Sequence, residues 1–487
     1  MFNENLVGAL ALIGIVILVA SLLSGVIERS GLPQVGIFLL LGALLGPAGL
    51  GLINLTLESP TLNIIATLAL VLVLFSDAIA MDMGEVRRQR RLALVVLGPG
   101  SLVPAVLIGL AGWQLLGLAP LPAMILGAAL ASTDPVLLRN LLRRPTLPPT
   151  ARVALRLESG MNDVVLLPIV VLGILAVQAG GTVIPMEFAR HAVGLFILGP
   201  ALGALVGFVA ITLLEKIRSR VGVRRDYESL YALGVAFTAF AAAESVGGSG
   251  FLAAFAAGIV VAAMDVELCD CFLDYGQATA EMFLLFTFVA FGAWIIWRGF
   301  SVADGRTLLF ALFALVARTL VLLPVLAKTG VAPRDRRLIA WFGPRGLSSL
   351  LLILLPVFAG MPGSVLLFEI TSLVVLLSVL LHGAGIALFL RKETGPGAPA
   401  STSPAPREAA KPASPEAPVP ERITLAEMRK LQETGELVVL ADVRTDRSYQ
   451  DDNLQAKGAI RLPPDDAVRR ARELGLDHHG TVVLYCA

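Results

Sequence analysis

The sequence predicts an all-α polytopic membrane protein of about thirteen transmembrane helices, followed by a small soluble α/β domain. The first observation behind this prediction is composition: of 487 residues, 56% are hydrophobic and 15% are charged, with a mean hydropathy of +0.82. Apolar runs of about 20 residues recur along the chain and are typical of transmembrane helices. The other two observations are the distribution of arginine and an abrupt change of composition after Lys392.

Charge-poor stretches give the positions of the expected helices. The first stretch follows Met-Phe-Asn-Glu-Asn, which lacks the basic residues of a signal peptide, so we expect a retained helix. The predicted spans are residues 6–27, 32–53, 61–80, 92–116, 119–138, 153–178, 191–214, 227–246, 250–264, 279–297, 306–327, 338–358 and 364–390.

Lysine and arginine are concentrated in alternate predicted loops. They gather after the third, fifth, seventh and eleventh spans and after the last, whereas loops after even-numbered spans are nearly free of them. The acidic loop 265–277 is the exception, and parity still places it inside. Because basic loops remain in the cytoplasm, we expect a multi-pass protein of the cytoplasmic (inner) membrane. Its N-terminus is predicted outside, and its C-terminal domain in the cytoplasm.

Composition divides the chain into three segments. Residues 1–392 form the predicted transmembrane domain. Residues 393–420 are rich in proline, alanine and serine, which predicts an extended, flexible linker. In residues 421–487, helical stretches alternate with the short apolar runs ELVVLADVR and TVVLYCA, which predicts a small α/β domain with a parallel sheet.

Composition also excludes several classes of function. The formal net charge is +1 and no basic face occurs, so no nucleic-acid partner is expected. Three cysteines, Cys269, Cys271 and Cys486, are too few for a disulfide framework. A single Cys-x-Cys pair is a weak metal signal, so we expect a solvated loop at 269–271. Neither a cofactor nor a resident metal is expected.

A proline-containing break interrupts the fifth predicted span. In Ser132-Thr133-Asp134-Pro135, the proline removes a helix hydrogen bond and disfavours helical geometry at Asp134. Within a membrane, such a break is tolerated where protein or a water-filled cavity satisfies the freed backbone groups. An acid beside the break favours an ion site over a simple kink, because many transporters build ion sites from broken helices at the bilayer midplane.

A second polar cluster, ESGMND at residues 158–163, lies in the sixth span. At helical spacing, Ser159, Asn162 and Asp163 share one face. That face offers a hydroxyl, an amide oxygen and a carboxylate, which are hard oxygen ligands suited to a small cation. The spacing therefore predicts a cation site on this helix.

The two carboxylates of this cluster are expected to have different roles, because Glu158 and Asp163 point away from each other. A buried glutamate needs a positive partner, and we expect Glu158 to form a structural ion pair with Arg345, with Arg318 as the second candidate. Because burial penalises an uncompensated charge, Asp163 would hold either a proton or a cation. One site with two competing ligands, exposed alternately to each side, is an antiporter.

These residues also resemble a known family, the sodium/proton antiporters of the monovalent cation:proton antiporter superfamily, in its NhaP-like branch. The resemblance extends over roughly residues 6–390. It rests on several motifs in order: LPQVGIFLLLGALLGP (32–47), STDPV (132–136), ESxxND (158–163), GSGFLAAFAAGIV (248–260), FVAFGAWI (288–295) and GPRG (343–346). The chain departs from the family at Ser76, where an acidic residue often occurs, although Asp77 follows.

The resemblance implies a fold with inverted repeats and two broken, crossing helices beside a dimerisation domain, and hence a homodimer in the lipid bilayer. It implies Asp163 as the alternating carrier of protons and cations, with Asp134, Thr133, Ser159 and Asn162 shaping the site. It implies the ion pair of Glu158 with Arg345. The neutral residue before Asp163 implies electroneutral exchange of Na+ or Li+, with K+ as a further candidate cation.

The C-terminal segment resembles a second family, the rhodanese-like sulfurtransferase domains. LADVRT (440–445), GAIRLP (458–463) and VVLYC (482–486) stand in the order typical of that family. The resemblance implies Cys486 as the residue that becomes a persulfide. Because the sequence given stops one residue later, without the loop that cradles the persulfide, we expect a truncated domain that is inactive or regulatory.

Three functions compete on this evidence. A secondary cation/proton antiporter, not an enzyme, fits the buried acids and the number of spans. A membrane-anchored rhodanese-type sulfurtransferase or a sulfur-compound transporter is the alternative, although an anchor needs only one or two spans. A cation channel would use the same acids as a filter, but a broken helix and one carboxylate shared by two ions favour alternating access.

Overall fold

The computed structural model divides into two compact units, Met1–Ala400 and Ser401–Ala487, which are described separately. The structure describes residues 34–393 except 82, 143, 145, 146, 181–184, 222–224 and 265–276; residues 438–443, 458–462, 467–476 and 481–485; and the isolated positions 14, 15, 17–19, 22 and 456. Most of the predicted span 6–27, the loop with Cys269 and Cys271, Cys486, and nearly all of the linker lie outside the described residues.

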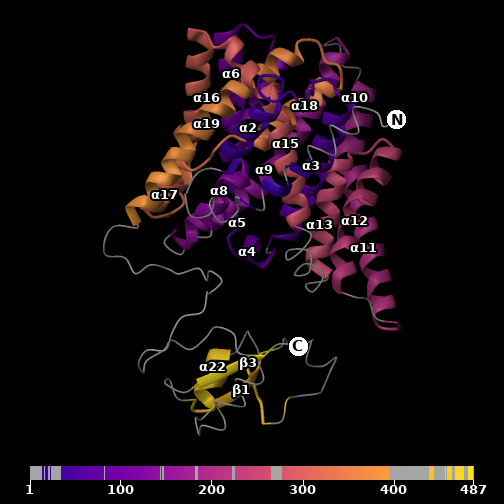
Figure 1. Cartoon of the computed structure of the whole chain (residues 1–487), viewed down its shortest axis with the longest axis vertical. Helices are drawn as coiled ribbons and strands as arrows, with labels where there is room; N and C mark the ends of the chain where they lie inside the picture. Colours follow the sequence, from indigo (N-terminus) through magenta and orange to yellow (C-terminus); the bar gives the residue numbers. More distant parts are fainter. Residues whose placement is uncertain are drawn as a thin grey trace. The chain divides into compact units, whose positions relative to one another are not determined.

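The first unit is helical (Figure 1). Its elements are α2 (Gln34–Leu45), α3 (Pro60–Ile79), α4 (Met83–Arg88), α5 (Arg90–Leu97), α6 (Pro99–Leu116), α7 (Pro120–Ala131), α8 (Pro135–Leu142), α9 (Pro149–Gln178), α10 (Pro185–Val193), the π-helical turn η1 (Gly194–Leu198), α11 (Gly199–Arg218), α12 (Arg225–Ser245), α13 (Gly250–Met264), α15 (Gln277–Ala293), the 3-10 helix η3 (Ile295–Val302), α16 (Gly305–Ala327), α17 (Pro333–Trp341), α18 (Leu347–Phe358) and α19 (Ser364–Glu393).

The helices agree with the predicted positions. Every predicted span from 32–53 onward contains at least one helix. Among the described residues, seven helices are long and apolar enough to cross a membrane, or eight if the bent pair formed by α15 and η3 is one span. Of the predicted spans that divide, 119–138 separates into α7 and α8, and 338–358 separates into α17 and α18.

Helix ends follow local chemistry. Proline occupies the first positions of α3, α6, α7, α9 and α17, where its missing N–H costs nothing. Asp304 caps α16, because its carboxylate accepts the backbone N–H of Thr307 at 2.7 Å. That hydrogen bond lowers the pKa of Asp304. These signals fix where the long helices begin.

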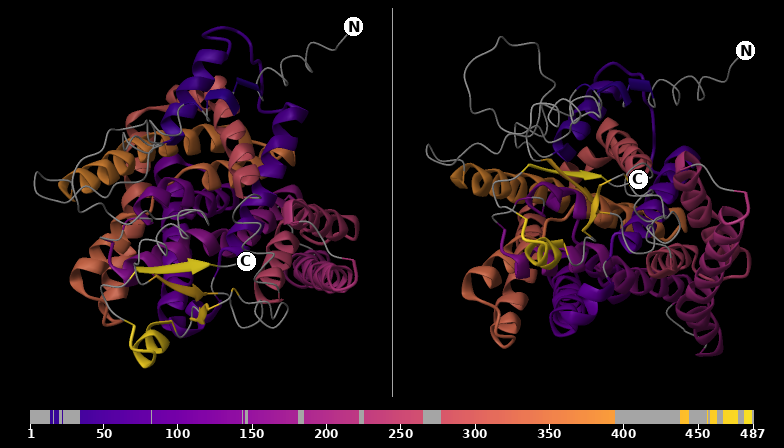
Figure 2. Two further views of the ribbon diagram at one scale, coloured as in Figure 1. Left: turned by 60° about the horizontal axis from the view of Figure 1, so that its bottom comes forward. Right: turned by 90° about the horizontal axis from the view of Figure 1, so that it is seen from below.

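The described helices form two groups. In the crossing group, α6 packs against α7 and α16, while α18 packs against α7, α9 and α19. In the flanking group, α13 packs against α3, α11 and α12, and α15 packs against α2 and α3. Helices α11, α12 and α13 lie side by side at the edge of the unit in all views (Figures 1 and 2).

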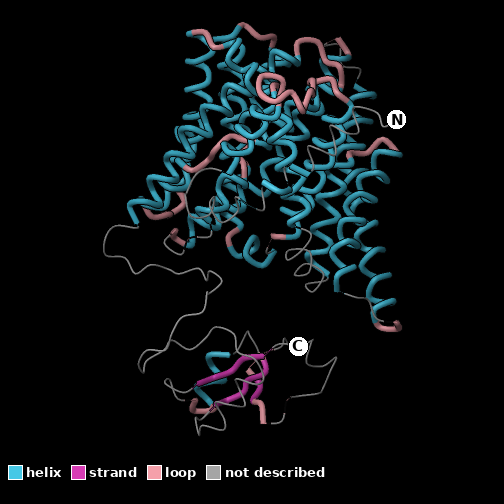
Figure 3. The backbone as a smooth tube through the Cα atoms, in the orientation of Figure 1, coloured by secondary structure: helices cyan, strands magenta, loops and turns pink. Residues whose placement is uncertain are grey.

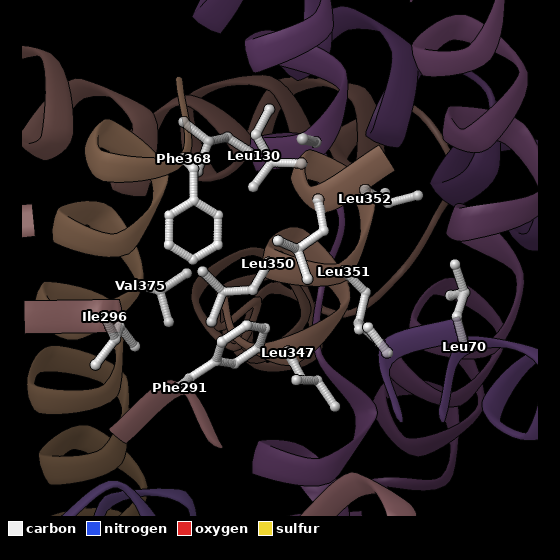
Figure 4. Packing of buried hydrophobic residues seen from close by; sticks show 14 of the residues in the cluster. Leu70, Leu130, Phe291, Ile296, Leu347, Leu350, Leu351, Leu352, Phe368 and Val375 are labelled. Atoms are coloured by element: carbon white, nitrogen blue, oxygen red, sulfur yellow. The ribbon is translucent and has the colours of Figure 1, made fainter. Parts of the chain in front are cut away.

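The largest apolar core surrounds α18. Five leucines of this short helix are almost fully buried, and the helix packs against α3, α7, α9 and α19. Figure 4 shows this packing, with labelled side chains Leu70, Leu130, Phe291, Ile296, Leu347, Leu350, Leu351, Leu352, Phe368 and Val375. A helix enclosed in this way is held in place although it spans only 12 residues.

Glycines allow α11 to approach α13 closely. Gly199, Gly203 and Gly207 recur every fourth residue and face α13, and a Cβ added at Gly203 would collide with the Ala253 backbone. Such small-residue faces are common where membrane helices pack without a hydrophobic driving force. The packing of α11 on α13 therefore depends on van der Waals contact between the two backbones.

The second unit contains a parallel sheet, as predicted for residues 421–487. Strands β1 (Val438–Asp442), β2 (Ile460–Arg461) and β3 (Thr481–Tyr485) are arranged in the order β2-β1-β3, with α22 (Ala467–Glu473) before β3. Both neighbours pair with β1 in parallel. Among the described residues, strands occur only in this unit (Figure 3). The helix predicted in LAEMRKLQETG lies outside the described residues.

Substituting Gly203→Ala is expected to lower the thermal unfolding midpoint of the detergent-solubilised protein, because overpacking costs about 1–3 kcal/mol. The matched control is Gly234→Ala on α12, where an added Cβ meets nothing within 4 Å. That variant should leave the midpoint unchanged or raise it. Equal midpoints for the two variants would contradict the close packing of α11 on α13.

Candidate functional site

Two helix breaks face each other in the crossing group. The first break is Ser132-Thr133-Asp134, between α7 and α8, and Pro135 begins α8. The second comprises residues 342–346 and separates α17 from α18. Both breaks are buried, so their free backbone groups need partners within the protein.

Asp134 supplies partners for both breaks. Its Oδ1 atom accepts the N–H of Val136 at 2.8 Å, and its Oδ2 atom accepts the N–H of Leu347 at 2.6 Å. Its own N–H donates to the carbonyl of Pro344 at 2.9 Å. One carboxylate therefore caps the N-termini of α8 and α18 together. A Cβ at Gly346 would overlap this carboxylate, which explains the glycine.

Arg345 supplies the opposite cap. Its Nη1 atom donates to the carbonyls of Ala131 at 2.6 Å and Ser132 at 3.1 Å. These carbonyls lie at the C-terminal end of α7, where a positive charge interacts favourably with the negative end of the helix dipole. The backbone N–H of Arg345 donates to the hydroxyl of Ser378 at 2.7 Å. Arg345 is 1% exposed, and these hydrogen bonds hold it within the helix crossing.

Asp163 lies on α9 beside the first break and is 3% exposed. The hydroxyl of Ser132 donates to its carboxylate, and the hydroxyl of Ser348 forms a second hydrogen bond. Within the described part of the chain, Asp163 forms no ion pair. It is therefore a buried carboxyl held by neutral hydroxyl groups alone.

The other predicted ligands surround this carboxyl. Asn162 Nδ2 donates to Thr133 Oγ1 at 2.7 Å, whereas Asn162 Oδ1 is buried and lacks a hydrogen-bond partner in the structure as described. Ser159 lies one turn before Asp163 and lines a cavity. The structure brings together Thr133, Asp134, Ser159, Asn162 and Asp163 between α7, α8, α9 and α18.

The structure corrects the predicted ion pair. Glu158 binds Arg318 of α16 through two hydrogen bonds, and it does not pair with Arg345. Both partners are 2% exposed. Arg318 also donates to the carbonyl of Ala340 at 2.8 Å. The prediction was wrong because the helix crossing places Arg318, the second candidate, across from Glu158, while Nη1 of Arg345 donates to the carbonyls at the end of α7.

A cavity of about 400 Å³ leads toward this site. It lies between the two helix groups, with α3 and α15 on one side and α8 and α9 on the other. Its lining includes Pro135, Ser159 and Gly160 near the site and the charged residues Asp77, Arg139, Arg156 and Glu281. Within the described ranges, no group of three His, Cys, Asp or Glu side chains is arranged to hold a metal.

Sequence reasoning missed some of the partners. The sequence places Ser132 in the break but does not identify it as a hydrogen-bond donor to Asp163; its position between the helix end and Thr133 was the available signal. Ser348 gave no comparable signal, because only the crossing brings α18 to Asp163. The ion pair of Arg139 with Glu281 joins distant helices and could not be read from spacing.

Comparison with known proteins assigns the family. Residues 14–392 match the family model described as sodium/hydrogen exchanger, transmembrane. The chain belongs to the sodium/hydrogen exchanger family. All the residues of the helix crossing, including Asp163 and Arg345, lie within the range that matches this family.

Similar proteins were found among curated relatives and solved structures. The exchanger is 27% identical to the K+/H+ antiporter NhaP of Alkalimonas amylolytica, over 79% of this chain and 68% of the relative. It is 28% identical to the K+/H+ antiporter NhaP2 of Shewanella sp. (strain ANA-3), over 77% and 65%. It thus spans about two thirds of these relatives' length. Its fold is similar to that of the sodium proton antiporter MjNhaP1 from Methanocaldococcus jannaschii, with a TM-score of 0.64 and 21% identity, over 79% of this chain and 99% of that chain.

The ion pair of Glu158 with Arg318 should contribute to the stability of the exchanger. Substituting Glu158→Gln leaves a buried arginine unpaired, which costs about 3–5 kcal/mol. A large fall in the unfolding midpoint in detergent is expected. The control is Glu369→Gln, which removes the partner of the more exposed Arg298 and should cost about 1 kcal/mol or less. Similar losses in both variants would contradict the buried structural role.

Proposed function

We propose that the protein exchanges a monovalent cation for protons across the cytoplasmic membrane by alternating access. The observation that carries this proposal is the state of Asp163. It is a buried carboxyl without an ion pair among the described residues, held by hydroxyl groups beside two broken helices. Because an isolated charge is costly there, a proton or a cation must neutralise it.

The contacts separate the roles of the two aspartates. Both oxygens of Asp134 accept backbone N–H groups, so a proton or cation on this carboxylate would compete with the caps of α8 and α18. The hydroxyl partners of Asp163 can reorient, because a hydroxyl both donates and accepts. They can donate to the free carboxylate or turn their lone pairs toward a bound cation. We therefore assign the exchanged proton to Asp163.

The free amide oxygen of Asn162 and the hydroxyls of Ser159 and Thr133 complete a set of oxygen ligands. They are neutral, so the site holds one titrating carboxyl. One proton released for each cation bound gives electroneutral exchange. The relatives named as K+/H+ antiporters bring K+ into the proposal beside Na+ and Li+.

The cavity supports a particular state of the transport cycle. It is lined by the end of α3, by α8, by the first turns of α9 and by the start of α15. The distribution of arginine predicts the cytoplasmic side for the loops next to α3, α8 and α9, and parity places the acidic loop before α15 on the same side. We propose that the structure is an inward-facing state in which Ser159 and Gly160 separate the cytoplasmic cavity from Asp163.

The sulfurtransferase alternative is not favoured. A membrane anchor would not need the helix crossing or the buried acids of the first unit. For the second unit, a rhodanese-like and regulatory role remains a proposal, supported by the parallel β1 and β3 and by the hydrogen bond from Tyr485 to Asp442 at 3.3 Å. The homodimer and the membrane orientation are likewise proposals.

Asp163 can be tested in proteoliposomes that contain a pH-sensitive dye. Cation-driven proton exchange is expected to fall to background in Asp163→Asn and Asp163→Ala, because neither side chain can hold the proton. Asp304→Asn removes an exposed carboxylate at the cap of α16 and should retain exchange. Wild-type exchange in both Asp163 variants would contradict the assignment of the exchanged proton to Asp163.

Cation selectivity and stoichiometry can be measured in the same proteoliposomes. Addition of Na+, Li+ or K+ ranks the three cations by apparent KM. An electroneutral exchanger should show the same rate when the membrane potential is clamped at zero or at a negative value. A rate that changes with the potential would contradict one-for-one exchange.

A further inference from the structure

The cavity contains an ion pair that the proposed site does not use. Arg139 Nη1 lies 2.7 Å from Glu281 Oε2, and the two side chains are 25% and 30% exposed. Gln34 Nε2 also donates to Glu281 Oε1 at 3.3 Å. Glu281 is thus held between α8 and α2, and both charged partners line the cavity that leads to Asp163.

A second acid lines the same cavity. Asp77 on α3 faces α9 at Gly160, where an added Cβ would lie 3.8 Å from the Asp77 Cβ. Within the described residues, Asp77 forms no salt bridge, yet the charges of both Arg139 and Asp163 act on it. A cation moving from the cavity toward Asp163 therefore passes a carboxylate and a nearby guanidinium.

The arginine creates a problem for a cation pathway. Its positive charge repels the transported ion, and its long side chain could pair with Asp77 and cancel the attraction of that acid. Arg156 also lines the cavity, but it is exposed, so water screens its charge more effectively. Arg139 is only partly exposed and lies on the helix that begins at the first break.

We propose that Glu281 is a positioning residue that holds Arg139 away from Asp77 and so preserves the attraction of the cavity for cations. The proposal rests on the antiport function proposed above. Glu281 does not contact the transported ion. It sets the apparent KM for the cation by neutralising Arg139 and fixing where its side chain lies.

A different role for the same pair would be mechanical. Arg139 is on α8, which packs against α9 of the crossing group, and Glu281 is on α15 of the flanking group. In this mechanical role, the pair would do no more than link the two groups. Loss of either partner would then have the same effect, because each substitution breaks the same bond. Electrostatic positioning instead predicts opposite effects of the two substitutions.

The test compares Glu281→Gln, Arg139→Gln and the double variant in proteoliposomes, with rates measured over a range of cation concentrations. Glu281→Gln should raise the apparent KM for the cation on the order of three- to tenfold, with little change in kcat, because an unpaired guanidinium repels the cation. Arg139→Gln should leave KM unchanged or lower it. The double variant should return KM toward the wild-type value, because the unpaired charge is gone.

The matched control is Glu369→Gln, which frees Arg298 from a pair of similar length that does not line the cavity. It should leave KM unchanged. Equal changes in KM or kcat for both single variants, or no recovery in the double variant, would overturn the proposal. If Asp163→Asn retains exchange, the antiport function fails instead. If Asp163→Asn is inactive and Glu281→Gln has the wild-type KM, the positioning role alone fails.

Discussion

The reciprocal capping of two broken helices is the constraint on which the rest of the structure depends. A membrane interior offers no water to unpaired N–H and C=O groups, so a break in one helix needs polar partners from another. The carboxylate of Asp134 accepts hydrogen bonds from N–H groups at the N-termini of α8 and α18. The guanidinium of Arg345 donates hydrogen bonds to the carbonyls at the C-terminal end of α7. The two charges thus serve opposite ends of helices that cross at one point.

This capping determines what the neighbouring side chains can do. With both oxygens of Asp134 occupied, Asp163 is left as the carboxyl whose partners are hydroxyl groups. The pairing of Glu158 with Arg318 removes another buried charge from the site. The three acids therefore have separate contacts: Asp134 caps the crossing helices, Glu158 pairs with Arg318, and Asp163 is the acid to which we assign ligand exchange. In the proposed mechanism, the cavity is the route from Asp163 to the cytoplasmic side.

Much of this arrangement was predictable because it depends on local sequence. Apolar runs located the helices, Pro135 located the first break, and helical spacing separated Glu158 from Asp163. The partners of these residues were harder to predict, since Arg345 and Arg318 lie on different helices and the sequence does not say which one reaches Glu158. The position of the second break was not predicted, for a related reason. Gly346 is required by the approach of the Asp134 carboxylate, and this contact exists only after the helices cross.

The central claim is that a proton and a cation compete for Asp163. The most direct test is to count the protons released when the cation binds to the purified protein in detergent, by titration in a weakly buffered solution with a pH indicator. The account predicts about one proton released per cation bound by the wild type and no release from Asp163→Asn. Cation binding without proton release in the wild type, or with the same release from the variant, would contradict it.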